Sequence, residues 1–344
     1  MEKRLTGDYT ESHGPRVGID CRSLANGPSG VATYVGNLRR WIPDLDCVFG
    51  RFPANNFLWN NVRIPLTYLT RSWDLFHAPS YTCPLVSLCP VILSVHDVAY
   101  LVRQEWYPYR LDWFRLRYYK SSIRVAERII VPSEFSKREV LRIFPELEGR
   151  VVHIPLGVSS DFFPDPEGAK AVRRQFGLPD QYLLHVGDIH GRRNLDLISR
   201  AAKALDIPLV LVGRIQKGGE PYSNWPLRFS VISLEELRGI YSGAQALVYA
   251  SVYEGFGLPL LESMACGTPV VAVGRASIPE VCGDAAILVE PESEALVEAV
   301  RIVITEQEEW SKRGLSRAQR FSWQKVADRT RELYQEVHRA NRRS

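Results

Sequence analysis

Two glutamates, Glu254 and Glu262, stand eight positions apart around a glycine-rich turn. Between them, residues 255–259 read Gly-Phe-Gly-Leu-Pro, after an apolar run at residues 246–250 and before a helical pattern. A strand, a glycine turn and a helix start present backbone N–H groups to an anion such as a phosphate. The two carboxylates can only accept hydrogen bonds, which suits sugar hydroxyl groups. The segment therefore predicts a nucleotide-sugar site; the alternative is two ordinary glutamates at a solvated helix start.

A second stretch with the chemistry to bind an anion covers residues 187–195, GDIHGRRNL. Arg192 and Arg193 stand directly before Asn194, which we expect to cap a helix at residues 195–205. Guanidinium groups at a helix N-terminus suit a diphosphate, because they add paired hydrogen bonds to charge. A solvated basic turn is the alternative.

Two positions in the first half of the chain also lie at the end of a predicted strand or in the loop that follows one. His96 ends the apolar run at residues 91–96, and Gly30 follows a Gly-Pro-Ser turn after the first apolar run. A histidine at the carboxyl end of a strand can hydrogen-bond a ligand, and backbone N–H groups at Gly30 can meet a phosphate. The alternatives are a histidine satisfied by neighbouring backbone and a simple glycine turn.

These residues need a scaffold, and the pattern supplies short apolar strands that alternate with amphipathic helices. The first half predicts strands at residues 16–20, 46–49, 74–77, 91–96 and 128–132 and helices at 30–41, 108–124 and 134–143. The second half predicts strands at residues 182–186, 208–212, 229–232, 246–250, 269–273 and 286–289 and helices at 195–205, 234–242, 258–266, 294–304 and 322–341. This alternation predicts an α/β protein with two parallel sheets, with prolines marking a boundary near residues 155–166. Ligands of such sheets bind at the carboxyl ends of the strands, here in a cleft between the domains.

Composition fits this organisation. The chain has 344 residues, 45% hydrophobic and 24% charged, which is typical of globular proteins with two domains of ordinary size. Residues 1–150 hold 20 Lys and Arg against 15 Asp and Glu, so the first half is expected to meet an anionic partner. Residues 1–15 lack the apolar stretch of a signal peptide and are predicted to be a disordered tail. Six scattered cysteines without a CxxC pair indicate a reducing cytoplasm.

One further stretch, residues 106–124, interleaves aromatic and cationic residues at helical spacing. This pattern suits a membrane interface with anionic lipids, or an acceptor that carries a diphosphate. The alternative is an amphipathic helix with its aromatics in the core. No nucleic-acid-binding motif accompanies the stretch, so we expect no nucleic-acid partner. No metal-ligand spacing and no NTPase phosphate loop occur in the chain, so no metal site and no cofactor are predicted.

From about Val17 to the C-terminus, the chain resembles the retaining glycosyltransferases of family GT4, which have the two-domain GT-B fold. The most specific match is residues 253–284, which hold the paired glutamates. The supporting matches lie at residues 18–20, 29–30, 95–97, 131–136 and 192–195. The resemblance implies a Rossmann-like acceptor domain at residues 16–158, a Rossmann-like donor domain at residues 159–324, and a C-terminal helix at about 325–344 that returns to the first domain.

The resemblance also implies roles for the residues of the glycine turn. Glu262 would accept hydrogen bonds from the ribose hydroxyls of the nucleotide, and Glu254 would contact the hydroxyls of the donor sugar. Phe256, Gly257 and Leu258 would offer backbone N–H groups to the sugar and the phosphate.

His96 would touch the donor sugar near the reacting carbon, and Gly30 would approach the diphosphate. Family members often place an arginine and a lysine on that diphosphate, but here Asp188 occupies the arginine's position and Arg193 the lysine's. Arg192 could replace the missing charge. His96, Arg192, Arg193 and Glu254 are thus the predicted catalytic residues.

The activity implied is metal-independent transfer of a sugar with retention of anomeric configuration, from a GDP- or UDP-linked donor to a glycan or lipid-linked acceptor. Mannose is the sugar that the resemblance favours. The place implied is the cytoplasm, with peripheral contact to the inner face of the cell membrane. The alternatives are a nucleotide-sugar epimerase or a phosphorylase on the same fold, and a sugar-nucleotide-binding protein without catalysis, to which Asp188 alone points.

Overall fold

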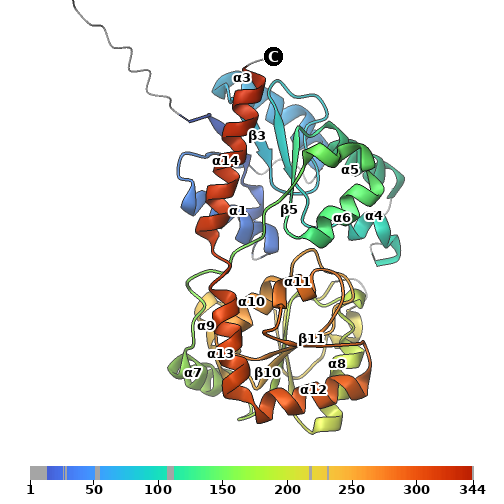
Figure 1. Ribbon diagram of the computed structural model, residues 1–344, viewed down its shortest axis with the longest axis vertical. Coiled ribbons are helices and arrows are strands. Elements are labelled where there is room, and N and C mark those ends of the chain that lie inside the picture. The colour runs from blue at the N-terminus through green and yellow to red at the C-terminus, as the bar shows by residue number, and fades with distance from the viewer. Residues whose placement is uncertain are drawn as a thin grey trace, which may run out of the picture.

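Two parallel sheets, one in each half of the chain, form the framework of the protein (Figure 1). The computed structural model describes residues 14–342, except positions 26, 28, 51–54, 107–111, 217–218 and 231. The predicted N-terminal tail therefore lies almost entirely outside the described residues. Each sheet has six strands in the described residues, in the orders β2-β1-β3-β4-β5-β6 and β12-β11-β10-β7-β8-β9. The predicted α/β fold with two doubly wound sheets is confirmed.

The strands are short and mostly buried. The first sheet contains β1 (Val17–Asp20), β2 (Asp46–Val48), β3 (Leu75–Ala78), β4 (Val91–Ser94), β5 (Arg128–Val131) and β6 (Val151–His153). The second contains β7 (Leu183–Val186), β8 (Leu209–Val212), β9 (Arg228–Phe229), β10 (Ala246–Tyr249), β11 (Val270–Val273) and β12 (Ile287–Val289). The central strands are buried along their whole length, as expected for parallel strands covered by helices on both faces.

Helices cover both faces of each sheet. The first half has α1 (Gly30–Trp41), α2 (Asn56–Leu58), a π-helical stretch at Trp59–Arg63, α3 (Ile64–Arg71), α4 (Ala99–Val102), α5 (Asp112–Val125) and α6 (Glu134–Ile143). The second half has α7 (Pro166–Phe176), α8 (Leu195–Leu205), α9 (Leu234–Gly243), α10 (Leu258–Ala265), α11 (Ile278–Cys282), α12 (Ser293–Thr305), α13 (Gln307–Ala318) and α14 (Trp323–Asn341). Within the described residues, no helix is both long enough and apolar enough to cross a bilayer.

For several elements that were not predicted, the structure shows why the sequence pattern missed them. Strand β6 has only three residues, and helix α13 is so polar that no apolar stripe marks it. Helix α7 begins at Pro166, within the stretch 155–166 whose prolines predict a domain boundary. Proline is favoured in the first helical turn, where its missing N–H has no partner. The helical stretch at residues 56–71 was also missed; half of its apolar residues face outward instead of marking a core.

The last helix, α14, crosses from the second half of the molecule back to the first, as predicted (Figure 1). A buried chain of hydrogen bonds fixes it there. Tyr334 of α14 bonds His77 Nδ1 at 2.6 Å, and His77 Nε2 bonds Ser94 Oγ at 2.8 Å. Ser94 donates to Tyr34 at 3.1 Å, and the Tyr34 ring packs edge-on against His96. Helix α14 thus supports the strand end that carries His96.

Removing one hydroxyl from this chain should destabilise the fold. Burial lowers the pKa of His77 to about 3, so its ring is neutral and depends on partners for both nitrogens. Tyr334→Phe leaves Nδ1 of this ring buried without its partner, and we expect the free energy of unfolding to fall by about 1–3 kcal/mol. Urea denaturation measures the change. The control, Tyr68→Phe on the half-exposed surface of α3, should stay within about 0.5 kcal/mol of wild type; equal losses in the two variants would contradict the role of the network.

Candidate functional site

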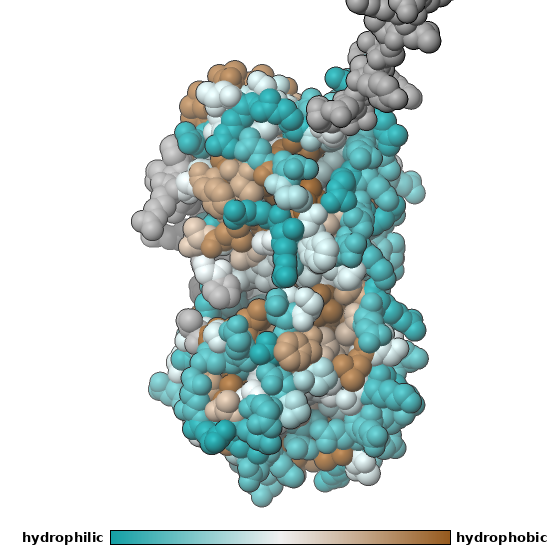
Figure 2. Space-filling view, turned by 90° about the vertical axis from the view of Figure 1, so that its left-hand side faces the viewer, coloured by the Kyte–Doolittle hydropathy of each residue, from teal (hydrophilic) through white to brown (hydrophobic). Residues whose placement is uncertain are grey.

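A cavity of about 430 Å³ opens between the two sheets, at the carboxyl ends of their strands. Figure 2 shows the narrow waist of the molecule, where hydrophobic residues come to the surface among polar ones. The first half contributes Gly30 and His96 to the lining, and the second half contributes the loop after β7 and the glycine turn. The site residues predicted from the sequence that line the cavity are Gly30, His96, Arg193, Glu254, Phe256, Gly257, Leu258 and Glu262. The structure therefore brings together all of the predicted site residues except Arg192.

Glu254 and Arg193 form a buried ion pair in this cavity. The Glu254 carboxylate accepts hydrogen bonds from Arg193 and from the Ser251 hydroxyl, and Arg193 also donates to the Tyr249 hydroxyl. Both charged side chains are less than 10% exposed. Burial opposes ionisation of Glu254, but Arg193, Arg192 and Ser251 together hold its pKa below the ordinary value. Glu254 is therefore an ionised acceptor, and Arg193 is a fixed cation beside it.

Glu262 lies in the second turn of α10, eight residues after Glu254. Its carboxyl group accepts a hydrogen bond from the Tyr241 hydroxyl at 2.8 Å. Burial raises the pKa of Glu262 to about 7, while the bond from Tyr241 acts in the opposite direction. Glu254 and Glu262 thus differ in charge near neutral pH, because only Glu254 has arginines beside it.

The turn between the two glutamates depends on its glycines. Gly257 has φ +104°, in the region that favours glycine, and α10 begins directly after it. Gly255 lies against the first half of the molecule, where a Cβ atom would stand 1.7 Å from the carbonyl oxygen of His96. Ser277 donates hydrogen bonds to the carbonyls of Glu254 and Phe256 at 3.0 and 2.9 Å. The turn is therefore fixed from its own side and pressed closely against the opposite side of the cleft.

His96 follows β4 and faces the cavity from the first half. Its Nε2 bonds the carbonyl oxygen of Pro79 at 2.9 Å. Burial lowers the pKa of His96, so the neutral ring carries its proton on Nε2, and Nδ1 is an acceptor. The alternative considered from the sequence, a histidine bonded only to backbone, holds for Nε2. The ring nevertheless lines the cavity. Gly30 lies at the start of α1, which Ser29 caps by accepting from the Ala32 N–H at 3.1 Å.

Arg192 does not line the cavity. Its guanidinium group donates to Asp97 of the first half at 3.3 Å, and both side chains are only 12–13% exposed. This pair joins the two sides of the cleft beside His96. Asn194 also differs from the expectation: its side chain makes no capping bond, because the residue adopts the left-handed conformation with φ +51°. The prediction of a side-chain cap at this position is wrong.

The charged residue of the cavity lining that sequence reasoning missed beside Asp188 is Arg214. It follows Gly213 at the end of β8 and lines the cavity together with Asp188. Asp188 accepts from Arg214 Nε at 3.3 Å and from Gln216 at 3.2 Å. Arg214 is 41% exposed, so its guanidinium group is accessible to an anion. The sequence signal that could have found Arg214 is Gly213-Arg214 directly after β8. Strand β8 pairs with β7, which is followed by Gly187-Asp188, so the positive charge of Arg214 lies beside the acidic Asp188.

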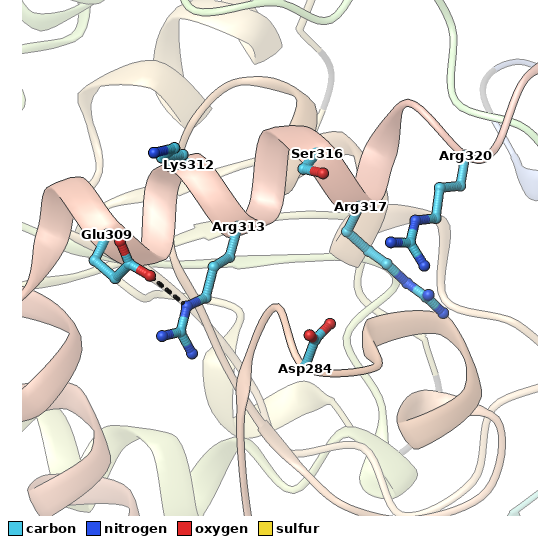
Figure 3. A pocket seen from close by; sticks show the side chains of 7 residues that line it. All are labelled: Asp284, Glu309, Lys312, Arg313, Ser316, Arg317 and Arg320. Carbon is cyan, nitrogen blue, oxygen red and sulfur yellow. Dashed lines mark hydrogen bonds and ion pairs between the residues drawn. The ribbon is translucent and has the colours of Figure 1, made fainter.

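A second, smaller cavity of about 220 Å³ lies along α13, away from the cleft (Figure 3). In Figure 3, Arg313, Arg317 and Arg320 reach from α13 and the turn after it toward the loop that carries Asp284. Arg317 donates to the carbonyls of Glu280 and Val281 at 2.6 and 2.9 Å. Arg317 therefore fixes the C-terminal end of α11, where a cation is favourable.

Family models match both halves of the chain: Glycosyltransferase Family 4 over residues 15–162 and Glycosyl transferases group 1 over residues 180–306. The chain is 30% identical over 287 residues to the O-antigen chain mannosyltransferase B of Escherichia coli, a match covering 76% of this chain and 74% of that protein. It is 27% identical over 217 residues to the GDP-mannose-dependent alpha-(1-6)-phosphatidylinositol dimannoside mannosyltransferase of Mycobacterium tuberculosis, covering 58% and 55%.

Among solved structures, sucrose-phosphate synthase from Thermosynechococcus elongatus superposes with a TM-score of 0.75 at 21% identity, over 95% of this chain and 100% of that chain. At this identity the likeness concerns the fold. The paired glutamates, the cavity between the two sheets and the family matches all point to the same family. The chain therefore belongs to the glycosyltransferases of group 1 and family 4, has their two-domain GT-B fold, and is a glycosyltransferase.

Proposed function

We propose that this enzyme transfers mannose from GDP-mannose to a glycan or lipid-linked acceptor, with retention of configuration and without a metal ion. The observation that carries the proposal is the cavity in which Arg193, Glu254 and Glu262 face His96 and Gly30. The donor would bind mainly to residues 159–324, and the acceptor would approach from residues 16–158. The choice of sugar rests on the two relatives above, whose names state mannose transfer and, for one of them, dependence on GDP-mannose.

The lining residues match the parts of a nucleotide sugar. Glu262, when ionised, is an acceptor for the two ribose hydroxyls, and Glu254 is an acceptor for hydroxyls of the sugar. Arg193 and Arg214 supply positive charge for the diphosphate. The sequence analysis expected Arg192 and Arg193 to share this role. Backbone N–H groups of residues 256–258 and of Gly30 add neutral donors.

These groups would promote transfer by stabilising the leaving diphosphate. The bond between the anomeric carbon and the phosphate oxygen breaks, and its electrons remain on that oxygen. The acceptor hydroxyl attacks the anomeric carbon from the same face, and its proton passes to the departing phosphate oxygen. Arg193 is already fixed by Glu254 and Tyr249, so it stabilises the developing charge without reorganising. In this scheme the arginines supply the charge that a metal ion would otherwise supply.

A thermal-shift screen of UDP-, GDP-, ADP- and dTDP-linked sugars tests the proposal, because a bound ligand raises the apparent stability by mass action. We expect the largest shift with GDP-mannose. NMR analysis of the product then reports the anomeric configuration. No shift with any donor, or a product of inverted configuration, would refute the proposal.

Binding of the donor should depend on pH through Glu262. Its pKa of about 7 means that the carboxyl group loses its proton as the pH rises from 6 to 8. If the ionised form binds the ribose, the affinity for GDP-mannose should rise about tenfold over this range. Calorimetric titration at several pH values measures the change. Glu262→Gln should bind more weakly and independently of pH, since an amide does not titrate; a wild-type affinity that falls as the pH rises would contradict this role.

We also propose that the first half of the molecule contacts an anionic membrane surface, through a wider surface than the predicted residues 106–124. Residues 107–111 lie outside the described part of the chain. In α5, Trp113 is 68% exposed, but Tyr118 is buried and donates to the carbonyl of Cys83. Helix α5 therefore combines both alternatives. Tyr118 packs in the core, as in an ordinary amphipathic helix, whereas Trp113 is exposed, as in a helix at a membrane interface.

The remainder of this surface is an apolar stripe on residues 56–71. Leu58, Val62, Leu66 and Leu69 are spaced three or four residues apart, hence on one face, and are 40–66% exposed. The Phe57 ring beside them packs against Phe114 of α5 at 5.4 Å. The same two segments carry exposed cations: Arg63, Arg115, Arg117 and Lys120. Residues 56–71 and 113–125 contain no acidic residue, so an anionic lipid surface is the partner with complementary charge.

The double variant Leu66→Glu/Leu69→Glu tests this surface. It places two charges in the apolar stripe, and we expect binding to vesicles of anionic phospholipid to fall by at least about tenfold in a flotation assay. Wild-type binding should weaken as salt is added, since the cations contribute. Leu234→Glu, on α9 in the other half and 40% exposed in the wild type, is the control. Equal vesicle binding by the double variant and the wild type would contradict the assignment.

A further inference from the structure

The segment at residues 131–136, which matched the family pattern without a role, crosses the cleft. Ser133 and Ser136, at the start of α6, both donate hydrogen bonds to the carbonyl oxygen of Gly255, at 2.7 and 3.2 Å. The two serines are at most 1% exposed. Two buried hydroxyls from the first sheet's helix therefore hold the turn between the paired glutamates.

Glu280 of α11 contacts the same helix end from the opposite side of the cleft. Its carboxylate accepts from the backbone N–H groups of Glu134 at 2.9 Å and Phe135 at 3.3 Å. These N–H groups have no partner within the helix, and a negative charge is favourable at this end of a helix. The ring of His153 in β6 contacts two carboxylates. Its Nδ1 lies 2.9 Å from the carboxylate of Glu134, and its Nε2 lies 3.5 Å from that of Glu280. Glu280 therefore satisfies donors of the opposite domain.

Helix α11 joins these contacts to the donor cavity. Ser277, directly before α11, holds the carbonyls of Glu254 and Phe256, while Glu280 within α11 holds α6. Arg317 fixes the C-terminal end of α11 by donating to the carbonyl of Glu280 at 2.6 Å. One short helix thus fixes the glycine turn on its own side and the start of α6 on the other.

We propose that Ser133, Ser136, Gly255 and Glu280 form a closure clamp that holds the cleft shut around the donor. Glu280 is a positioning residue in this clamp, since it lies outside the cavity lining and acts through α6 and the glycine turn. The clamp keeps Gly255 against the His96 carbonyl and thereby sets the distance between His96 and the sugar site. Closing the cleft also excludes water, which would otherwise hydrolyse the donor. The catalytic part of this inference rests on the proposed function.

Two variants separate the contributions to the clamp. Glu280→Lys places a positive charge at the α6 N-terminus, where it is unfavourable, and Ser136→Ala removes one buried bond while alanine keeps the helix. We expect kcat to fall about tenfold in Glu280→Lys and several-fold in Ser136→Ala, and the ratio of donor hydrolysis to transfer to rise in both. Glu280→Gln, which retains an acceptor oxygen, should recover most of the activity. The charge-matched control is Glu298→Lys on the exposed face of α12, which should behave as wild type.

Hydrogen exchange provides a readout that does not depend on turnover. The amides of residues 134 and 135 should exchange about tenfold faster in Glu280→Lys than in wild type, with the melting temperature little changed. Unchanged exchange, or faster exchange with kcat and the hydrolysis ratio unaltered, would overturn the inference. Faster exchange in an enzyme that turns over no nucleotide sugar would support the clamp and refute the proposed function.

Discussion

Replacing Arg193 with alanine is expected to lower kcat by about 10²–10³-fold, which is typical for the loss of one preorganised group that stabilises developing charge. Arg193 is buried, lines the cavity, and is held by Glu254 and Tyr249. Its removal takes a cation from the position proposed for the leaving diphosphate and leaves Glu254 as an unpaired buried charge. Steady-state kinetics with GDP-mannose, together with circular dichroism to verify folding, measure the effect.

Arg193→Lys separates charge from geometry. Lysine keeps a cation but lacks the planar fork, so we expect kcat between those of wild type and the alanine variant. Arg200→Ala, on the exposed face of α8, is the matched control and should retain full activity. If folded Arg193→Ala turns over within about twofold of wild type, the arginine does not stabilise the transition state.

Gly255→Ala is expected to reduce kcat/KM by at least about 100-fold, because a displacement of about 1 Å at a reacting centre is sufficient for such a loss. The new Cβ atom would lie 1.7 Å from the carbonyl oxygen of His96, which is backbone and cannot rotate away. The cleft must therefore open or the glycine turn must move, and either change separates His96 from Glu254.

The matched control is Gly149→Ala. Apart from its chain neighbours and the backbone of its own helix, no atom lies within 4 Å of the position of its Cβ. Gly149 stands on the short helix before β6, outside the cavity lining. We expect this variant to keep wild-type activity. Small-angle scattering should show a larger radius of gyration only for Gly255→Ala. Normal activity of Gly255→Ala would mean that the close approach to His96 has no importance for catalysis.

The sequence predicts the scaffold well because its signals are local. Apolar strands alternate with helices, and the segment around Glu254 and Glu262 follows a strand and opens a helix, so the position of both carboxylates at one sheet edge was predictable. His96 and Gly30 were placed in the cavity by the same rule for the carboxyl ends of parallel strands.

The rest depends on contacts between residues far apart in the chain. Nothing local distinguishes Arg192, which pairs with Asp97 across the cleft, from Arg193, which enters the cavity. Arg214 compensates for Asp188 only because β7 and β8 are neighbours in the sheet. Glu280 resembles an ordinary helix glutamate until α6 of the other half meets it. The exposed face of residues 56–71 likewise follows from which side of that helix packs on the sheet.

Calorimetric titration of GDP-mannose into the wild type and into Glu262→Ala, at pH 8, tests most directly that the cavity between the sheets is the donor site. We expect one site per chain in the wild type and a loss of affinity of about tenfold or more in the variant, because two hydroxyl groups lose a charged acceptor. Equal affinity in the two proteins, or no binding to the wild type, would contradict this role of the cavity.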